Sequence, residues 1–157
     1  MARNLQEEIR QSKPFQTAQE EAFLSILRTA GHLRRLATQV VEKWGITEQQ
    51  YNVLRILRGA GDAGSPTLEI ASRMIEATPG ITRLIDRLGA KKLILRQRCR
   101  EDRRQVICRI APGGLQVLKE LDSPSLKFTA ESLSALSKDE LRTLISLLDR
   151  IRAGKKQ

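Results

Sequence analysis

The sequence predicts a mainly helical protein that carries one small β-hairpin. Apolar residues recur at helical spacing along most of the 157-residue chain. Capping signatures of the form Ser/Thr-x-x-Glu/Gln, which mark helix starts, stand at Thr17, Thr47 and Ser137. After Lys92 the pattern changes to two short apolar runs around a polar turn, which is typical of a hairpin. At this length we expect one domain with a core of its own.

The N-terminal third is expected to be an arm followed by one long helix. Residues 1–16 are polar and contain Pro14, which predicts a flexible arm or a frayed first turn. The capping signature at Thr17 opens a helix that runs to about Lys43, and Gly45 ends it.

Three shorter helices are expected between residues 46 and 92. The first opens at Thr47 and stops in the connector GAGDAGS, and it buries Val53, Leu54 and Leu57. Ser65-Pro66 and Thr78-Pro79 each start a further helix, because proline at the first helical position loses no hydrogen bond. The inner face of the second is predicted to hold Leu68, Ala71 and Met74. The third buries Ile81, Leu84, Ile85 and Leu88, and its outward face carries Thr82, Arg83, Asp86 and Arg87.

The hairpin and two final helices complete the expected order. Its strands are 93–95 and 106–110, joined by the turn QRCREDRR, and Cys108 lies on the apolar face as part of the core. A helix follows from Pro112, and Pro124 is expected to bend or interrupt it. The capping signature at Ser137 opens the last helix.

The composition argues against several classes of protein. No apolar run approaches the roughly 20 residues that span a bilayer. The N-terminal segment MARNLQEEIRQSK lacks the apolar core of a signal peptide, so we expect a cytoplasmic protein with no membrane partner. One histidine and two distant cysteines make no recognisable metal site, and no cofactor is implied. Nucleophile motifs and phosphate-binding loops are missing from the sequence, so no enzyme is expected.

Positive charge is concentrated in residues 78–104. This stretch holds nine Lys or Arg against three Asp or Glu, a net charge of +6 out of +10 for the whole chain. A helix followed at once by a basic hairpin is the arrangement of a winged helix-turn-helix, which lays its helix in a groove of DNA. Because this region has none of the stacking aromatics that RNA and single strands require, the expected partner is double-stranded DNA.

Four segments carry a family likeness. They are Ile46-Thr47 leading into YNVLRIL, then TLEIASRM, then TPGITRLIDRLGAKKLI, and finally EDRRQVICRIAPGG. With this order of motifs the chain resembles the MarR family of bacterial transcription regulators over roughly residues 20–150. The resemblance implies one domain over 17–157, with dimerisation helices at about 17–44 and 112–152 and a winged helix lobe at about 46–111. Two departures are Lys92, where the family often has glycine, and Ala111, where it usually has threonine.

Ten residues are expected to contact DNA: Thr78, Gly80, Thr82, Arg83, Arg87, Arg98, Arg100, Asp102, Arg103 and Arg104. The helix start at Thr78 and Gly80 suits a phosphate, because free amides and the helix dipole meet there. Thr82 and Arg83 are expected to reach base edges in the major groove. The resemblance makes Arg104 a minor-groove finger and Asp102 the acceptor that holds the wing tip in shape. The alternative for the arginines is a solvated charged surface.

The resemblance also implies a small anionic, often aromatic, effector between the dimerisation helices and the DNA-binding lobe. Arg28, His32 and Tyr51 are the candidate lining, and the alternative for them is a polar interface or surface role. The predicted function is a sequence-specific transcription regulator, a ligand-responsive repressor that binds a pseudo-palindromic operator as a homodimer.

Two alternative functions remain open at this point. Cys99 stands between Arg98 and Arg100, where positive charge favours the thiolate, and its oxidation would make the protein a redox-sensing repressor. The bland alternative for Cys99 is an incidental exposed cysteine. The second alternative is a non-specific architectural protein that uses the same fold without sequence preference.

Overall fold

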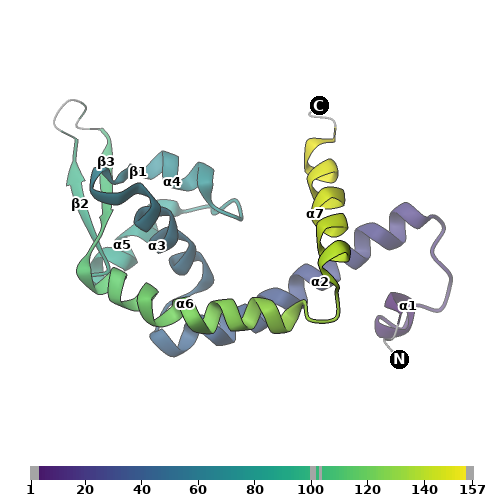
Figure 1. The fold of residues 1–157 in the computed structure, drawn as a ribbon. Helices are drawn as coiled ribbons and strands as arrows, with labels where there is room; N and C mark the ends of the chain where they lie inside the picture. The colour runs from purple at the N-terminus through teal and green to yellow at the C-terminus, as the bar shows by residue number, and fades with distance from the viewer. Residues whose placement is uncertain (1–3, 100–101, 103, 155–157) are drawn as a thin grey trace. The chain divides into compact units, whose positions relative to one another are not determined.

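The computed structural model describes residues 4–99, 102 and 104–154, and these form helices and one small sheet (Figure 1). Contacts within the chain divide it into two compact units, Met1–Leu118 and Lys119–Gln157. The mainly helical fold class with a small β-hairpin is therefore confirmed.

The first unit holds most of the elements. In chain order they are α1 (Leu5–Glu8), α2 (Ala18–Val41), the 3-10 turn η1 (Glu42–Trp44), α3 (Glu48–Ala60), the 3-10 turn η2 (Gly61–Ala63), β1 (Ser65–Pro66), α4 (Thr67–Arg73), α5 (Ile81–Ala90), β2 (Ile94–Arg98), β3 (Val106–Ile110) and the start of α6 (Pro112–Ser132). The second unit holds the rest of α6 and α7 (Lys138–Ala153). Helix α1 lies within the segment expected to be a flexible arm, and the side chain of Asn4 caps it.

Side-chain caps start three of the helices, as their sequence signatures predict. The hydroxyl oxygens of Thr17, Thr47 and Ser137 each accept a hydrogen bond from the backbone N–H three residues later. At Thr47 and Ser137 the return hydrogen bond completes the capping box. At Thr17 the box is incomplete, because the carboxylate of Glu20 accepts from the N–H of Gln16 at 2.8 Å instead.

The sheet has three antiparallel strands in the order β1-β3-β2. In the hairpin, Ile94 pairs with Ile110 and Arg98 with Val106. Strand β1, which pairs Ser65 with Cys108, was predicted to be the start of a helix, and that prediction was wrong. Pro66 has no N–H to give, so it suits a two-residue edge strand as well as a first helical turn.

The approach of β1 to β3 depends on Gly64. Its φ is +69°, and a Cβ there would lie 2.4 Å from the carbonyl oxygen of Cys108. Only glycine fits such a close approach in a left-handed conformation. The chain therefore enters the sheet at Ser65, and α4 begins later than predicted, at Thr67.

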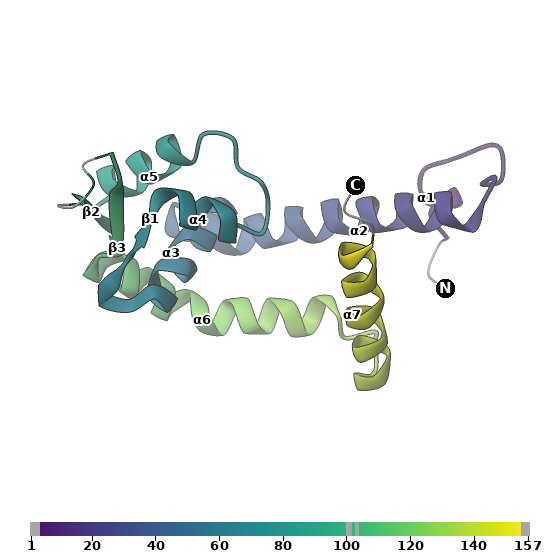
Figure 2. The same ribbon diagram turned by 90° about the horizontal axis from the view of Figure 1, so that it is seen from above.

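The core of the first unit lies between the sheet and helices α3, α4 and α5, which gather around it in both views (Figure 2). Its fully buried residues include Val53, Leu54, Leu57, Ile70, Leu88 and Cys108. The prediction that Leu68 lies on the inner face of α4 was wrong, since 81% of this residue is exposed and Ile70 is buried in its place. The inward stripe runs through Thr67, whose hydroxyl donates to the carbonyl of Val106 at 3.3 Å, and through Ile70 one turn later.

Helix α6 continues through Pro124 as one element of 21 residues. Of the bend or interruption expected at that proline, the interruption is therefore wrong, and the bend stays a prediction. A proline inside a helix removes one backbone donor, and a helix of this length tolerates that loss. No helix among the described residues is both long enough and apolar enough to cross a lipid bilayer.

Candidate nucleic-acid interface

Helix α5 has one buried face and one charged face. Leu84, Ile85 and Leu88 are buried, and Ile81 is half-buried. The opposite face is exposed, and it consists of Thr82, Arg83, Asp86 and Arg87. The predicted division of this helix is confirmed, so its polar groups are free to meet a partner outside the core.

The start of α5 differs from the prediction. Thr78-Pro79 was expected to open the helix, but the first helical residue is Ile81 and Gly80 occupies the N-cap position. Gly80 has a φ of +86°, a left-handed conformation that glycine adopts without strain. The hydroxyl of Thr78 donates to the carbonyl of Glu76 at 3.0 Å, so it closes a turn before the helix. No side-chain hydrogen bond caps α5, and the first N–H groups of a helix have no partner within the helix itself.

The end of α5 is held by a pair of backbone hydrogen bonds that form a Schellman motif. The N–H of Lys92 donates to the carbonyl of Gly89 at 2.9 Å, and that of Leu93 donates to the carbonyl of Leu88 at 3.0 Å. Lys92 itself adopts a left-handed φ of +58°. The ammonium of Lys91 donates to the carbonyl of Gly45, which ties this end of α5 to the junction between α2 and α3.

Two arginines of the sheet brace the interface, and neither was predicted as a site residue. Arg96 on β2 forms an ion pair with Asp86 on the outward face of α5. Arg109 on β3 donates to the carbonyl of Asp62 at 2.7 Å and to the side chain of Gln97 at 3.2 Å. No local sequence pattern predicts the first pair, because Asp86 and Arg96 lie in different elements that only folding brings together.

The tip of the hairpin is organised by Asp102. Its carboxylate accepts from the backbone N–H of Arg104 at 3.0 Å and from the Nε of the same residue at 3.2 Å. The N–H of Gln105 donates to the backbone carbonyl of Asp102 at 2.9 Å. These contacts close the turn while 93% of the Arg104 side chain stays exposed. Arg98 is also exposed, and the predicted site residues Arg100 and Arg103 lie outside the described residues.

The two cysteines differ in their surroundings. Cys99 is half-buried at the base of the tip, and it lines a shallow hollow of about 210 Å³ with Gln97, Arg98, Ile107 and Arg109. Cys108 is fully buried, and burial raises the pKa of its thiol. The predicted core position of Cys108 is confirmed.

The three candidate effector residues each contact a different neighbour. Arg28 lies 3.6 Å from a carboxylate oxygen of Glu8 in α1. The Nδ1 of His32 lies 3.3 Å from the guanidinium of Arg35 on the same helix. The ring of Tyr51 lies under Arg55, 5.8 Å from the guanidinium carbon to the ring centre. An effector pocket at these residues stays a prediction.

Known proteins that are similar to this chain along most of its length belong to the MarR family. The family model described as MarR family matches residues 46–106. A MarR transcription factor from Planctomyces limnophilus is 38% identical, with a TM-score of 0.68, over 87% of this chain and 98% of that one. A mutant MarR from E. coli complexed with operator DNA is 25% identical, with a TM-score of 0.72, over 80% of this chain and 89% of that one.

A curated relative agrees with these structures. The HTH-type transcriptional regulator MhqR of Bacillus subtilis is 27% identical over 135 residues, which is 86% of this chain and 92% of that protein. The outward basic face of α5, the braced hairpin beside it and these similarities lead to one conclusion. The chain belongs to the MarR family and is a DNA-binding transcription regulator.

Proposed function

We propose that the chain is a ligand-responsive repressor that binds a pseudo-palindromic operator as a homodimer. One observation carries the proposal. Helix α5 presents Thr82, Arg83 and Arg87 to solvent beside a hairpin whose Arg104 is held outward by Asp102. A rigid helix and a basic hairpin side by side suit neighbouring grooves of duplex DNA.

Helix α5 is the proposed major-groove element. Thr82 and Arg83 lie in its first turn, where the side chains of a recognition helix meet base edges, and an arginine there can bind guanine in a bidentate way. Thr78 and Gly80 immediately precede this turn, and its uncapped N–H groups are proposed to hold a DNA phosphate. Arg87, one turn later on the same face, is proposed to contact the backbone.

The hairpin is the proposed minor-groove element. Arg104 is the proposed finger, because narrow minor grooves concentrate negative potential and attract arginine. Asp102 would face the phosphates unfavourably by itself, but its carboxylate is engaged by Arg104. Arg98, together with Arg100 and Arg103 from outside the described residues, is proposed to add positive charge to this contact.

A second copy of the chain is the proposed cover for two apolar helix faces. Helix α2 spans 24 residues and buries only Val41, while Phe23 and Leu27 are exposed. Helix α7 buries none of its residues, and Ile145 and Ile151 are exposed on it. Amphipathic helices of this kind gain stability by covering their apolar stripes. A dimer would also place two copies of α5 about one helical turn apart, which a pseudo-palindromic operator requires.

The response to an effector is the third part of the proposal. Arg28 and His32 on α2 and Tyr51 on α3 are proposed to bind a small anionic aromatic molecule, whose charge the arginine would complement.

We further propose that the protein acts in the cytoplasm and has no enzymatic activity. Among the described residues no group of His, Cys, Asp or Glu is placed to hold a metal ion.

The experiment that tests the proposal is selection of bound sites from a randomised duplex library. Wild type should enrich a two-fold symmetric motif with half-sites about 10 base pairs apart. Arg83→Ala should relax the motif at one position per half-site, and Arg104→Ala should weaken selection in the flanking sequence. Arg142→Ala, which removes the same charge from the exposed surface of α7, is the matched control. Tight binding with no enriched motif would instead indicate an architectural protein.

A further inference from the structure

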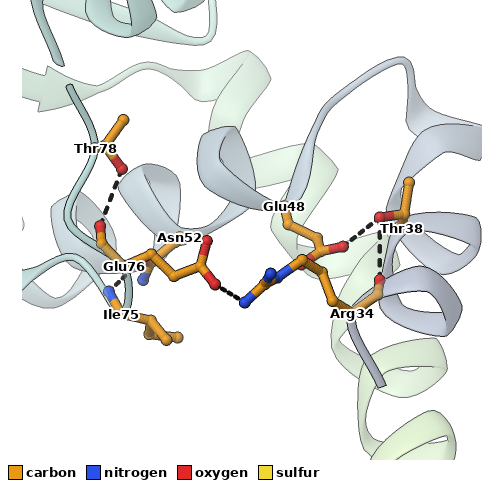
Figure 3. Close-up of polar contacts among 7 residues, drawn as sticks. All are labelled: Arg34, Thr38, Glu48, Asn52, Ile75, Glu76 and Thr78. Atoms are coloured by element: carbon orange, nitrogen blue, oxygen red, sulfur yellow. Dashed lines mark hydrogen bonds and ion pairs between the residues drawn. The ribbon is translucent and has the colours of Figure 1, made fainter. Parts of the chain in front are cut away.

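The segment between α4 and α5, residues 74–80, is held by side chains of two other helices (Figure 3). From α2, the guanidinium of Arg34 reaches the carboxylate of Glu76 and forms an ion pair with it. From α3, the side-chain oxygen of Asn52 accepts a hydrogen bond from the N–H of Ile75 at 2.9 Å. These partners are 42 and 23 residues apart in sequence, so the segment is fixed by the fold rather than by its own chain.

The same region also joins α2 to α3. The hydroxyl of Thr38 lies within hydrogen-bonding reach of the Glu48 carboxylate and, at 3.1 Å, of the Arg34 carbonyl (Figure 3). Its single proton serves one acceptor at a time. The part of α2 that holds Arg34 is therefore bonded to α3 through Thr38 and Glu48. From that part of the helix, Arg34 forms its ion pair with Glu76.

These contacts matter because α5 has no cap of its own. No side-chain hydrogen bond caps its first turn, and the Thr78 hydroxyl closes the turn before it by donating to the Glu76 carbonyl. Gly80 then allows a left-handed backbone immediately before the helix. The contacts at residues 75 and 76 therefore hold the chain that leads into α5 and into the turn that carries Thr82 and Arg83.

We propose that Arg34, Glu76 and Asn52 are positioning residues that set the start of α5 for recognition of the operator. This inference rests on the proposed function, since it concerns the helix that is proposed to contact base edges. The three residues act through α5 and not by touching DNA.

The expected size of the effect follows from exposure. The side chains of Arg34 and Glu76 are 52% and 41% exposed, so their ion pair is partly screened by water. A pair of this kind contributes about 1.5- to 5-fold to an equilibrium constant. Both subunits of a dimer carry it, so its loss should lower operator affinity by about 2- to 25-fold.

Four variants of the full chain separate positioning from simple charge. Arg34→Ala breaks the ion pair, and Arg35→Ala removes the same charge from the next residue, whose contact is with His32 on the same helix. Asn52→Ala frees the N–H of Ile75. The double reversal Arg34→Glu with Glu76→Arg restores an ion pair and keeps the net charge of the wild type. Each is measured for affinity to the selected operator and to an unrelated duplex, and for amide hydrogen exchange of residues 75–83 without DNA.

We expect Arg34→Ala and Asn52→Ala to lose operator affinity beyond the loss in Arg35→Ala, and to exchange faster in residues 75–83. The double reversal should recover both properties to within about 2-fold of the wild type. If Arg34→Ala and Arg35→Ala lose operator affinity equally, the lost positive charge alone explains the effect, and the inference is overturned.

The proposed function can fail separately from this inference. If the wild type selects no operator, the proposed function fails, and hydrogen exchange still tests whether these residues hold the start of α5. Unchanged exchange in both Arg34→Ala and Asn52→Ala would overturn the positioning role whatever the DNA results.

Discussion

Lys92 has a backbone conformation that residues with a side chain rarely adopt. It follows the last turn of α5 with a φ of +58°, at the position where the Schellman motif favours glycine. The left-handed region costs a residue with a Cβ about 1–2 kcal/mol. The family that the sequence resembles often has glycine at this position, and the strain of a left-handed lysine gives a physical reason for that preference. A lysine at a helix C-terminus offsets part of the strain through the helix dipole.

Replacing Lys92 should therefore stabilise the protein. We expect Lys92→Gly to raise the free energy of unfolding by about 1 kcal/mol and the melting temperature by about 2–4 °C. Lys91→Gly is the contrasting variant, because Lys91 is right-handed and its ammonium bonds the Gly45 carbonyl. It should lower the melting temperature. A lower melting temperature for Lys92→Gly would show that its charge outweighs the strain.

The two cysteines should react at very different rates with a thiol-alkylating reagent. Cys99 is half-buried at the base of the wing tip, whereas Cys108 is fully buried and burial raises the pKa of its thiol. At neutral pH we expect mass spectrometry to find one label, on Cys99, and a second only after unfolding. If alkylation or peroxide treatment of Cys99 leaves operator affinity unchanged, the redox-sensing alternative is wrong. Cys99→Ser is the control, because any effect of the treatment on this variant comes from modification of other residues.

At the scale of single elements, α7 depends on its capping box. The carboxylate of Glu140 accepts from both the backbone N–H and the hydroxyl of Ser137 at 2.8 Å, and these hydrogen bonds lower its pKa. A carboxylate with a lowered pKa in the folded state adds stability above its unfolded pKa. That contribution is lost as the pH falls through the folded pKa.

The cap should therefore make the stability of the protein depend on pH on the acid side. We expect Glu140→Gln to be less stable than the wild type near neutral pH, and the difference to shrink as the pH falls from about 6 to about 3. Urea unfolding midpoints across this range measure it. Asp139→Asn, in the same turn, removes a carboxylate that does not bond Ser137. A constant difference between Glu140→Gln and the wild type would contradict the assigned cause.

Whether an element could be predicted depended on how far apart in sequence its stabilising partners lie. Helix starts with a local cap at Thr17, Thr47 and Ser137 were predicted because the cap and its partner lie three residues apart. Strand β1 was missed because its partner β3 lies about forty residues away, and Ser65-Pro66 suits either structure locally. The start of α5 was misplaced because Gly80 adopts a left-handed φ of +86° after Thr78-Pro79, in a segment that Arg34 and Asn52 contact from other helices.

At the scale of the whole molecule, charge governs the interaction with DNA. The chain carries a net charge of +10, and residues 78–104 carry +6 of it. If a dimer neutralises about 6–10 phosphates, operator affinity should fall by about 10³–10⁵-fold between 50 and 200 mM salt. Fluorescence anisotropy across that range measures the slope. Affinity that does not change with salt would mean that the basic face of α5 and the wing do not meet the phosphates.

The sequence by itself determined the six longer helices, the hairpin, the face of α5 that points outward and the concentration of charge around it. These follow from periodicity, capping and composition, which act over a few neighbouring residues. The tertiary structure alone decided where α5 begins, that Ser65 joins a sheet, that Leu68 is exposed and that Arg96 pairs with Asp86. Each of these depends on a partner brought near by folding, and no local pattern encodes which partner that is.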